Sequence, residues 1–516
     1  MIDGDFGLLS PVTASPAVTA LTGDRAVIAA ILDVESAWAS VLEDAGLAPE
    51  GSAAVVAEAA DPGQYDLAAI AERAQGGANP VIPLLGELRA RVRELDSAGI
   101  GAASAVHTSL TSQDVLDSTL MLLASRTVSA LLAEVQGTTT ALATLAERHA
   151  DTLCVGRSLT QHALPYTFGL RAAQWFHGVA AAASRLTSLA LPVQFGGAGG
   201  TLASGTKLTG GSGLAAGSSL AASPGSGLAA GSSLAGSPGS ATASAVGPGS
   251  GPASGSGSTP FTLADDLASK LGLSPAVAPW HTNRLAVTGL GDALAALVDS
   301  FGKIAADLLF LSRPEVGELG EPLAAGRGVS SAMPQKQNPV LSVLIRSAAL
   351  QAPGLASQLH LAAATFNDER PDGAWHTEWP ALRRLLALTI GAAIQLRELA
   401  EGLRVFPEAM RRNLEISGPL LLSEGVTAAV APRLGEDGKQ KLQAVVDETL
   451  KAPADQQADT YRKLLREAVP TDKLPDEELD ALLDPASYLG EAKEISRRIL
   501  AAHPDFTAST KGATRG

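Results

Sequence analysis

A chain of 516 residues is too long for one hydrophobic core, so we expect two or three domains. Its net charge of −15 argues against non-specific binding to nucleic acid or to an anionic membrane. The single cysteine, Cys154, excludes an intramolecular disulfide and a thiolate cluster for zinc. No apolar run of membrane-spanning length stands out, and the acidic N-terminus lacks the basic start of a signal peptide, so we expect a cytoplasmic protein.

Alanine and leucine dominate the apolar residues and only 4% of residues are aromatic, which favours closely packed helices over a β-sandwich. The pattern predicts a helix over 24–46, with Asp24 as its cap and Gly46 at its end. A long helix is predicted over 114–150, opening at Asp114, whose carboxylate can bind free N–H groups. Strand signals are scarce, so the predicted fold is all-α with a central bundle of long helices. Further helices are predicted over 80–95, 165–190, 284–312, 339–364 and 378–403, with shorter ones through 407–503.

Residues 210–258 interrupt this pattern, because they are almost all small. The segment holds 14 Gly, 14 Ser, 11 Ala and 4 Pro, without a charged or aromatic residue. Such a composition cannot bury enough apolar surface to offset the entropy lost on ordering, so we predict a disordered low-complexity insertion at about 203–259. The predicted domains are an N-terminal helical domain (1–110), the central bundle (111–370) and a C-terminal helical domain (371–516).

The polar run of residues 330–339, SSAMPQKQNP, is the most informative segment for chemistry. Its prolines and small residues predict an ordered but mobile loop, and such loops often carry function. Lys336 can neutralise a substrate carboxylate, Asn338 can donate a hydrogen bond to it, and Ser330 can lie beside the reacting carbon. On composition alone, a polar surface loop explains the segment equally well.

Three other polar segments accompany this loop. Residues 107–114, HTSLTSQD, place hydroxyls at a helix start, which suits an anion, although Asp114 can serve simply as a cap. Residues 156–162, GRSLTQH, contain one histidine, which in isolation is more often structural than catalytic. Residues 368–379 combine charged residues with two tryptophans and, taken alone, fit an aromatic corner with surface ion pairs.

The order and spacing of these segments resemble the fumarase/aspartase superfamily, whose serine loop follows roughly the pattern GSSxMPxKxNP. The resemblance runs from near the N-terminus to beyond residue 425, except for residues 210–258. It implies a long-helix core and a homotetramer in which loops from three subunits build each active site. It also implies a small polycarboxylate substrate, and elimination or addition through a carbanion without any cofactor.

The resemblance assigns roles residue by residue. Ser330 aligns with the residue that exchanges a proton with carbon, and its oxyanion would need support from Lys336 and loop N–H groups. His162 would orient and stabilise the substrate, because a carboxylate leaving group needs little help from a general acid. We therefore predict Ser330, His162 and Lys336 as catalytic residues. The predicted substrate-binding residues are His107, Thr111, Ser112, Gln161, Asn338, Arg284 and Arg370.

Within the superfamily, the chain most resembles bacterial 3-carboxy-cis,cis-muconate cycloisomerases, which implies interconversion of that muconate and carboxymuconolactone. Leu159 also favours the cycloisomerase branch of the superfamily. Two departures from the pattern are Ser109-Leu110 in place of Gly-Ala, and Val329 in place of the glycine before the serines. The other shared motifs are 5–11 (DFGLLSP), 79–83 (NPVIP), 279–282 (PWHT) and 373–379 (GAWHTEW).

Other functions stay open at this point. Leu110 favours a superfamily lyase that acts on a substituted succinate, such as adenylosuccinate or nitrosuccinate, and forms fumarate or a related alkene. Val329 would suit a catalytically silent helical oligomer, which the retained serine, lysine, asparagine and histidine oppose. A metal-dependent hydrolase is disfavoured, because the eight histidines are scattered and no pair has the helical spacing of a metal site.

Overall fold

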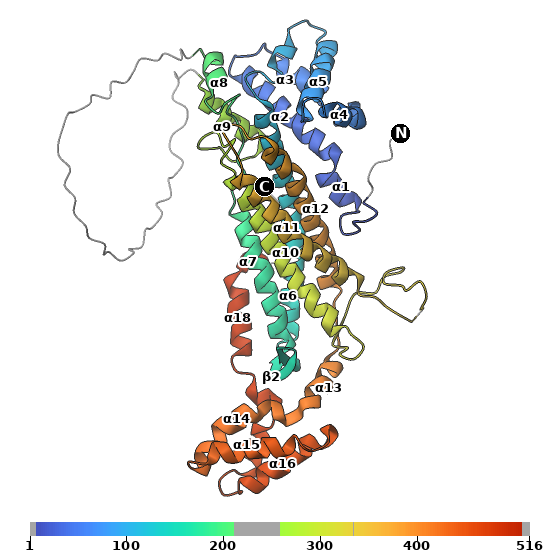
Figure 1. The fold of residues 1–516 in the computed structure, drawn as a ribbon, viewed down its shortest axis with the longest axis vertical. Coiled ribbons are helices and arrows are strands. Elements are labelled where there is room, and N and C mark those ends of the chain that lie inside the picture. Colours follow the sequence, from blue (N-terminus) through green and yellow to red (C-terminus); the bar gives the residue numbers. More distant parts are fainter. Residues whose placement is uncertain (1–6, 211–257, 334, 508–516) are drawn as a thin grey trace, which may run out of the picture.

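The computed structural model describes residues 7–210, 258–333 and 335–507. Five long helices run side by side along the longest dimension of the molecule and form its central bundle (Figure 1). Within the described residues only four short strands accompany the helices, so the predicted all-α class is confirmed. The bundle helices are α6 (Ser112–Arg148), α7 (Phe168–Thr187), α10 (Leu285–Leu311), α11 (Val340–Ala364) and α12 (Gly373–Glu401).

Small residues let the bundle helices approach closely. A Cβ added to Gly302 of α10 would lie 2.5 Å from the Cβ of Ala349 on α11. A Cβ added to Gly291 of α10 would lie 2.6 Å from a methyl group of Leu359 on α11. Larger side chains at these glycines would force the two helices apart. This close contact explains why a sequence rich in alanine and leucine, with few aromatic residues, folds into a bundle.

The N-terminal helices gather at one end of the bundle (Figure 1). Helix α2 packs against α6 and buries Trp38, whose ring lies 4.9 Å from that of Phe195. Helices α8 (Ala203–Leu208) and α9 (Pro260–Leu271) lie at the same end. The N-terminal helices are α1 (Pro16–Thr22), α2 (Asp24–Asp44), α3 (Ser52–Ala59), α4 (Leu67–Ala74) and α5 (Val81–Leu95).

The C-terminal helices gather at the opposite end of the bundle and have their own apolar core, built from residues such as Leu442, Tyr461 and Leu465 (Figure 1). The chain then turns back, and α18 (Ala492–Ala502) packs along α7, followed by the short α19 (Pro504–Thr507). The predicted domain boundaries at 110/111 and 370/371 stay predictions. The other C-terminal helices are α13 (Pro407–Ser417), α14 (Ser423–Val430), α15 (Gly438–Thr449), α16 (Gln457–Ala468) and α17 (Asp476–Leu482).

The strands form two small antiparallel pairs. Strands β1 (Leu153–Ser158) and β2 (Gln161–Thr167) make a hairpin just before α7, and β3 (Leu319–Gly320) pairs with β4 (Arg404–Val405). The hairpin occupies the first residues of the helix predicted over 165–190, which therefore begins later, at Phe168.

Two details of the predicted elements are wrong. Asp24 is the first residue of α2 rather than its cap, which is Gly23. Residues 203–208 form α8, so the predicted insertion does not begin at 203. Most of that predicted insertion, residues 211–257, lies outside the described residues.

Among the described residues, three helical stretches are long and apolar enough to cross a membrane by length and composition, contrary to the sequence-based expectation that no run reaches this length. In the α6 stretch, 72% of the most apolar window is buried inside the protein. In the α11 stretch only 33% is buried, and Leu350 and Leu361 of α11 are 73% and 66% exposed. The third stretch is Pro407–Leu434, also 33% buried. The surface of α11 is thus unusually apolar for an exposed helix.

Candidate active site

The start of α6 brings two of the predicted binding residues together. Thr111 is the N-cap of α6, and its hydroxyl oxygen accepts a hydrogen bond from Nη1 of Arg370 at 3.0 Å. Ser112 is the first residue of the helix. The helix starts two residues before the predicted Asp114, which is its third residue. The predicted capping role of Asp114 is confirmed, because its carboxylate completes a capping box by accepting a hydrogen bond from the Thr111 N–H at 3.0 Å. Hydroxyls, a guanidinium and a helix N-terminus together suit a carboxylate.

His107 lies close to this helix start and is held by a partner that the sequence did not reveal. Its Nδ1 is 2.7 Å from Oε1 of Glu35 on α2, a carboxylate with no exposed surface. His107 and Ser109 have positive φ angles of 63° and 66°, which are uncommon for residues other than glycine. Glu35 precedes His107 by 72 residues, and nothing in one sequence pairs them.

Asp114 links the start of α6 to two distant segments of the chain. Its Oδ1 accepts hydrogen bonds from Nε2 of His281 at 2.8 Å and from the Gly196 N–H at 2.9 Å. Its Oδ2 also accepts a hydrogen bond from the Gly197 N–H at 3.0 Å. The side chain of Asp114 is fully buried, so these bonds fix the loop of Gly196 and Gly197 against α6. Sequence analysis identified His281 only as part of a motif and gave it no role.

Arg284 was predicted to bind a substrate carboxylate, and the structure corrects this. Its guanidinium is fully buried and donates hydrogen bonds to Asp117, Glu378 and the Trp280 carbonyl, which together engage all five N–H groups. Burial disfavours its charge, but the two carboxylates outweigh this and raise the pKa of Arg284. Burial also disfavours the charged form of Glu378 and raises its pKa, and the neighbouring Arg284 partly offsets this rise. Arg284 therefore holds the bundle together at this end and has no donor left for a substrate.

The hairpin of β1 and β2 presents a second group of predicted residues. Its two turn residues, Leu159 and Thr160, both have positive φ angles, 48° and 70°. This pattern is that of a tight two-residue turn, here without the usual glycine. Leu159 is 94% exposed and Gln161 is exposed beside it. Within the described residues, the amide of Gln161 contacts only the Thr160 hydroxyl, so the hairpin tip offers polar and apolar groups to solvent.

His162 sits on β2 opposite Arg157 and is only partly buried. Its Nδ1 lies 2.9 Å from the hydroxyl oxygen of Ser417, at the end of α13. Burial and the nearby Arg157 guanidinium lower the pKa of His162, while Glu318 opposes them. Glu318 is fully buried and accepts hydrogen bonds from Arg157 and Asn413. The environment of His162 therefore favours a neutral imidazole.

The lowered pKa of His162 predicts a pH effect on stability. Below the ordinary value of 6.5 the unfolded chain takes up this proton more readily than the folded protein, so stability should fall as the pH drops. His162→Gln removes the titrating group and should flatten this dependence. Thermal unfolding of both proteins at about pH 7.5, 6.5 and 5.5 checks the prediction. Parallel curves for the two proteins would contradict it.

The serine loop lies between β3 and α11. The hydroxyl oxygen of Ser330 accepts hydrogen bonds from the N–H groups of Met333 at 3.2 Å and Ala332 at 3.4 Å. Lys336 is exposed, and no partner is recorded for its ammonium group among the described residues. The Asn338 amide donates to the Gly328 carbonyl at 3.0 Å. Ser330 thus has backbone donors at hand, whereas Lys336 does not contact it in the single chain.

Val329 fits the loop without strain. It forms an isolated antiparallel bridge with Gln337, and its side chain is 63% exposed. The left-handed position precedes it, at Gly328, whose φ angle is +69°. A Cβ at Gly328 would lie 2.4 Å from the Asn338 carbonyl oxygen, so glycine is needed there rather than at 329. The valine therefore does not by itself argue for an inactive protein.

A single chain does not bring the helix start at Thr111, the hairpin with His162 and the serine loop with Ser330 together. Helix α6 has 37 residues, so the helix start at Thr111 and the hairpin beyond its other end are about 55 Å apart. The serine loop is anchored near the hairpin end, where Arg327 pairs with Glu398, late in α12. Among the described residues, no recorded interaction joins Ser330 to His162 or Thr111. The predicted constellation is therefore divided between the two ends of the bundle.

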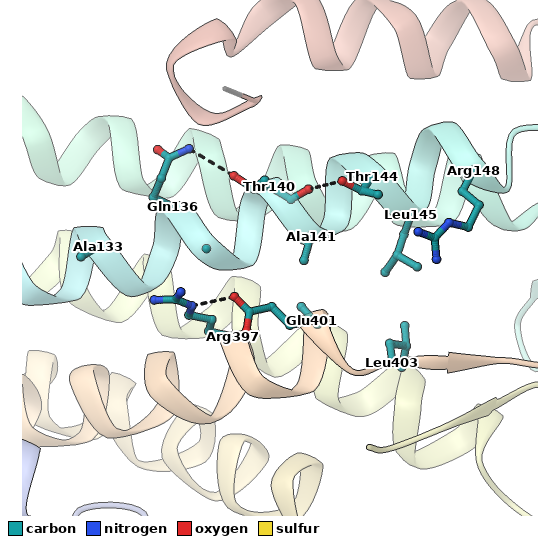
Figure 2. Close-up of a pocket in the computed structure, with 12 residues that line it drawn as sticks. Ala133, Gln136, Thr140, Ala141, Thr144, Leu145, Arg148, Arg397, Glu401 and Leu403 are labelled. Carbon is teal, nitrogen blue, oxygen red and sulfur yellow. Dashed lines mark hydrogen bonds and ion pairs between the residues drawn. The ribbon is translucent and has the colours of Figure 1, made fainter. Parts of the chain in front are cut away.

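Two surface grooves lie near the hairpin end. One, of about 740 Å³, lies between the hairpin, α7 and α10 and is lined by Arg157, Thr160 and Arg171 among others. The other, of about 620 Å³, lies between α6 and α12 and is lined by Thr140 and Arg148 of α6 and by Arg397 and Glu401 of α12 (Figure 2). None of the predicted site residues lines the second groove. Within the described residues, no cluster of three or more His, Cys, Asp or Glu side chains is placed to hold a metal ion.

The helical bundle and these polar segments define the class of protein. A family model described as Lyase matches residues 13–213 and 241–354, more than half of the chain. The chain therefore belongs to this lyase family of the fumarase/aspartase superfamily and is an enzyme of that superfamily.

Its relatives include proteins with two different activities. Nitrosuccinate lyase of Streptomyces davaonensis is 39% identical, over 99% of this chain and 97% of the relative. A 3-carboxy-cis,cis-muconate cycloisomerase of Bradyrhizobium diazoefficiens is 34% identical, over 96% of this chain and 97% of the relative. The crystal structure of 3-carboxy-cis,cis-muconate lactonizing enzyme from Pseudomonas putida has a TM-score of 0.78 and 31% identity, covering 97% of this chain and 100% of that chain.

Proposed function

We propose that this enzyme interconverts 3-carboxy-cis,cis-muconate and carboxymuconolactone. The observation that carries the proposal is the similarity to cycloisomerases and to the lactonizing enzyme over nearly the whole chain. The Trp-His motifs at 280–281 and 375–376, which favour the same branch, support it. The substrate would be a small polycarboxylate in the cytoplasm, with no nucleic acid or membrane as partner and no cofactor in the reaction.

In the direction of lactone opening, Ser330 would take the proton from the carbon next to a carboxylate. The negative charge would spread onto that carboxylate, which Lys336 and Asn338 would hold. The C–O bond of the lactone then breaks, and the ring oxygen leaves as a carboxylate. Microscopic reversibility makes the same serine the proton donor in lactone formation. Thr111, Ser112 and Gln161 would hydrogen-bond the other carboxylates.

The environment of His162 bears on which group the substrate can expel. A neutral imidazole with a lowered pKa is suited to orienting the substrate rather than to carrying a proton to it. Carboxylates are weak bases and leave without a proton, whereas the amine released from adenylosuccinate-type substrates is a strong base. A substrate that expels a stable anion needs no proton from His162, which agrees with the lowered pKa of this histidine.

Nitrosuccinate is the second candidate substrate, favoured by the 39% identity to nitrosuccinate lyase. Removal of a proton from the carbon beside a carboxylate would expel nitrite and leave fumarate. Nitrite is also a stable anion, so the argument from His162 applies equally. Both reactions would use the same serine loop.

A direct assay separates the two candidates. The purified full-length chain is incubated with each substrate, and loss of muconate absorbance is measured beside release of nitrite and fumarate. Muconate turnover with little nitrite release supports the cycloisomerase, and the opposite result overturns it in favour of the nitrosuccinate lyase. If neither substrate reacts, both proposals fail.

We also propose that the active sites are shared between subunits of a homotetramer. The predicted residues lie at opposite ends of α6, about 55 Å apart, so an antiparallel neighbour is needed to bring them together. Helix α11 offers the surface for such a contact, because only a third of its apolar window is buried in one chain. Exposed apolar surface of this kind commonly marks a protein interface.

Leu350→Glu should break this assembly. Leu350 is 73% exposed on α11, so a charge there leaves the single chain folded but would be desolvated in an interface. We expect a smaller particle by size-exclusion chromatography with light scattering, and loss of activity with it. Leu450→Glu, at a 58% exposed leucine outside the bundle, is the control and should leave both unchanged. An unaltered particle mass in Leu350→Glu would argue against α11 as the contact.

A further inference from the structure

His281 has a buried nitrogen that the site described so far does not use. The residue is 3% exposed, and its Nε2 is 2.8 Å from Asp114. Backbone N–H groups also reach both Asp114 oxygens, so Asp114 acts as the acceptor and Nε2 of His281 as the donor. The other ring nitrogen, Nδ1, is buried without a hydrogen-bond partner. Such an atom is costly to bury, and a glutamine could satisfy Asp114 without it.

The loop of residues 196–201 passes close to this nitrogen. A Cβ added to Gly200 would lie 3.6 Å from Nδ1 of His281, and one added to Gly196 would lie 2.7 Å from the ring carbon Cε1. Gly197 and Gly200 both have positive φ angles, 70° and 73°. The glycines therefore let the backbone approach the imidazole closely and keep side chains away from Nδ1.

The same loop carries unused hydrogen-bond donors. The N–H groups of Gly196 and Gly197 donate to Asp114. Those of the next four residues, Ala198 to Thr201, have no recorded partner among the described residues. Successive free N–H groups in a turn that contains left-handed residues form a concavity suited to an anion. Ala198 is exposed, so solvent reaches this part of the loop.

We propose that His281 and residues 196–201 bind one carboxylate of the substrate, with Nδ1 of His281 and N–H groups of the loop as the hydrogen-bond donors. A tricarboxylate needs three anchors. Lys336 with Asn338 supplies one and Thr111 with Arg370 supplies another, so the glycine loop would supply the third. The proposal names a binding residue for the proposed function and rests on it.

Equilibrium binding of tricarballylate to the full-length chain tests this without turnover. His281→Gln keeps a donor for Asp114 but lacks the second nitrogen. We expect its dissociation constant for tricarballylate to rise about tenfold or more, because a hydrogen bond to a charged group is lost. Succinate, which needs only two anchors, should bind with nearly unchanged affinity. Isothermal titration calorimetry measures both, and thermal unfolding should show an unchanged midpoint.

Gly199→Val provides a second variant that leaves His281 in place. A Cβ at Gly199 meets nothing within 4 Å and its φ angle is not positive, so the fold should tolerate valine while its side chain covers the free N–H groups. Its affinity for tricarballylate should fall similarly. Wild-type affinity in both variants would overturn the proposal and assign Nδ1 to an internal water. A wild-type chain that does not bind tricarballylate would overturn it as well. Because no reaction is needed, either result is independent of whether the muconate is turned over.

Discussion

Ser330→Ala should lower kcat about 10²–10⁴-fold and leave the fold intact, because it removes the group proposed to exchange the proton with carbon. Among the described residues, the serine hydroxyl accepts two recorded hydrogen bonds, both from N–H groups of its own loop. Their loss should change the free energy of unfolding by no more than about 0.5 kcal/mol. Steady-state kinetics on whichever candidate substrate the wild-type enzyme turns over, together with thermal unfolding, measures both effects.

The neighbouring serine is the matched control for this experiment. Ser331 is exposed in the same loop, so Ser331→Ala makes the same chemical change one residue away. Its kcat should stay close to that of the wild type. Near-normal turnover in Ser330→Ala, or an equal loss in both variants, would remove Ser330 from the proposed role.

Arg284→Met should cause the largest loss of stability. The substitution leaves Asp117 and Glu378 buried without their cation, and breaking a buried ion pair in this way costs about 3–5 kcal/mol. Chemical denaturation measures the change in the free energy of unfolding. Arg411→Met is the control, since Arg411 is 60% exposed and pairs with exposed glutamates, so its loss should change the free energy of unfolding far less.

The same experiment tests the corrected role of Arg284. If Arg284 bound a substrate carboxylate instead, Arg284→Met would raise KM while leaving stability nearly unchanged. The contacts in the structure predict the opposite pattern. An unaltered free energy of unfolding in Arg284→Met would contradict the assignment of Arg284 to the buried framework.

The helical bundle could be predicted because helix propensity and periodicity depend on residues that are close in the sequence. Long stretches of alanine and leucine with helical periodicity predicted α6, α10 and α11 to within about two residues at each end. The start of α12 was placed five residues late, at 378 instead of Gly373. Its first turns contain an aromatic and charged motif, and Pro380 lies inside the helix, so propensity argued against a helix there. Packing of the tryptophans against the bundle outweighed that preference.

The hairpin was missed for a related reason. Its turn uses Leu159 and Thr160 at positive φ angles, without the Asn-Gly or Asp-Gly pair that usually identifies such turns. The residue types of the site could be predicted, but their partners could not. Arg284 is fixed by carboxylates 167 and 94 residues away in the chain, and His107 by one 72 residues away. Pairings over such distances depend on the folded bundle and leave no local pattern.

The packing of the α8 and α9 segments against each other determines where the protein can be modified. Leu202, which precedes α8, and Leu263 of α9 are buried in one apolar cluster with Trp38, although residues 211–257 separate the two helices in the sequence. The anchoring contacts therefore lie outside the low-complexity stretch. Closing a longer loop costs little extra free energy, so this point should accept a shortened linker, an affinity tag or a fluorescent reporter far from the hairpin end of the bundle.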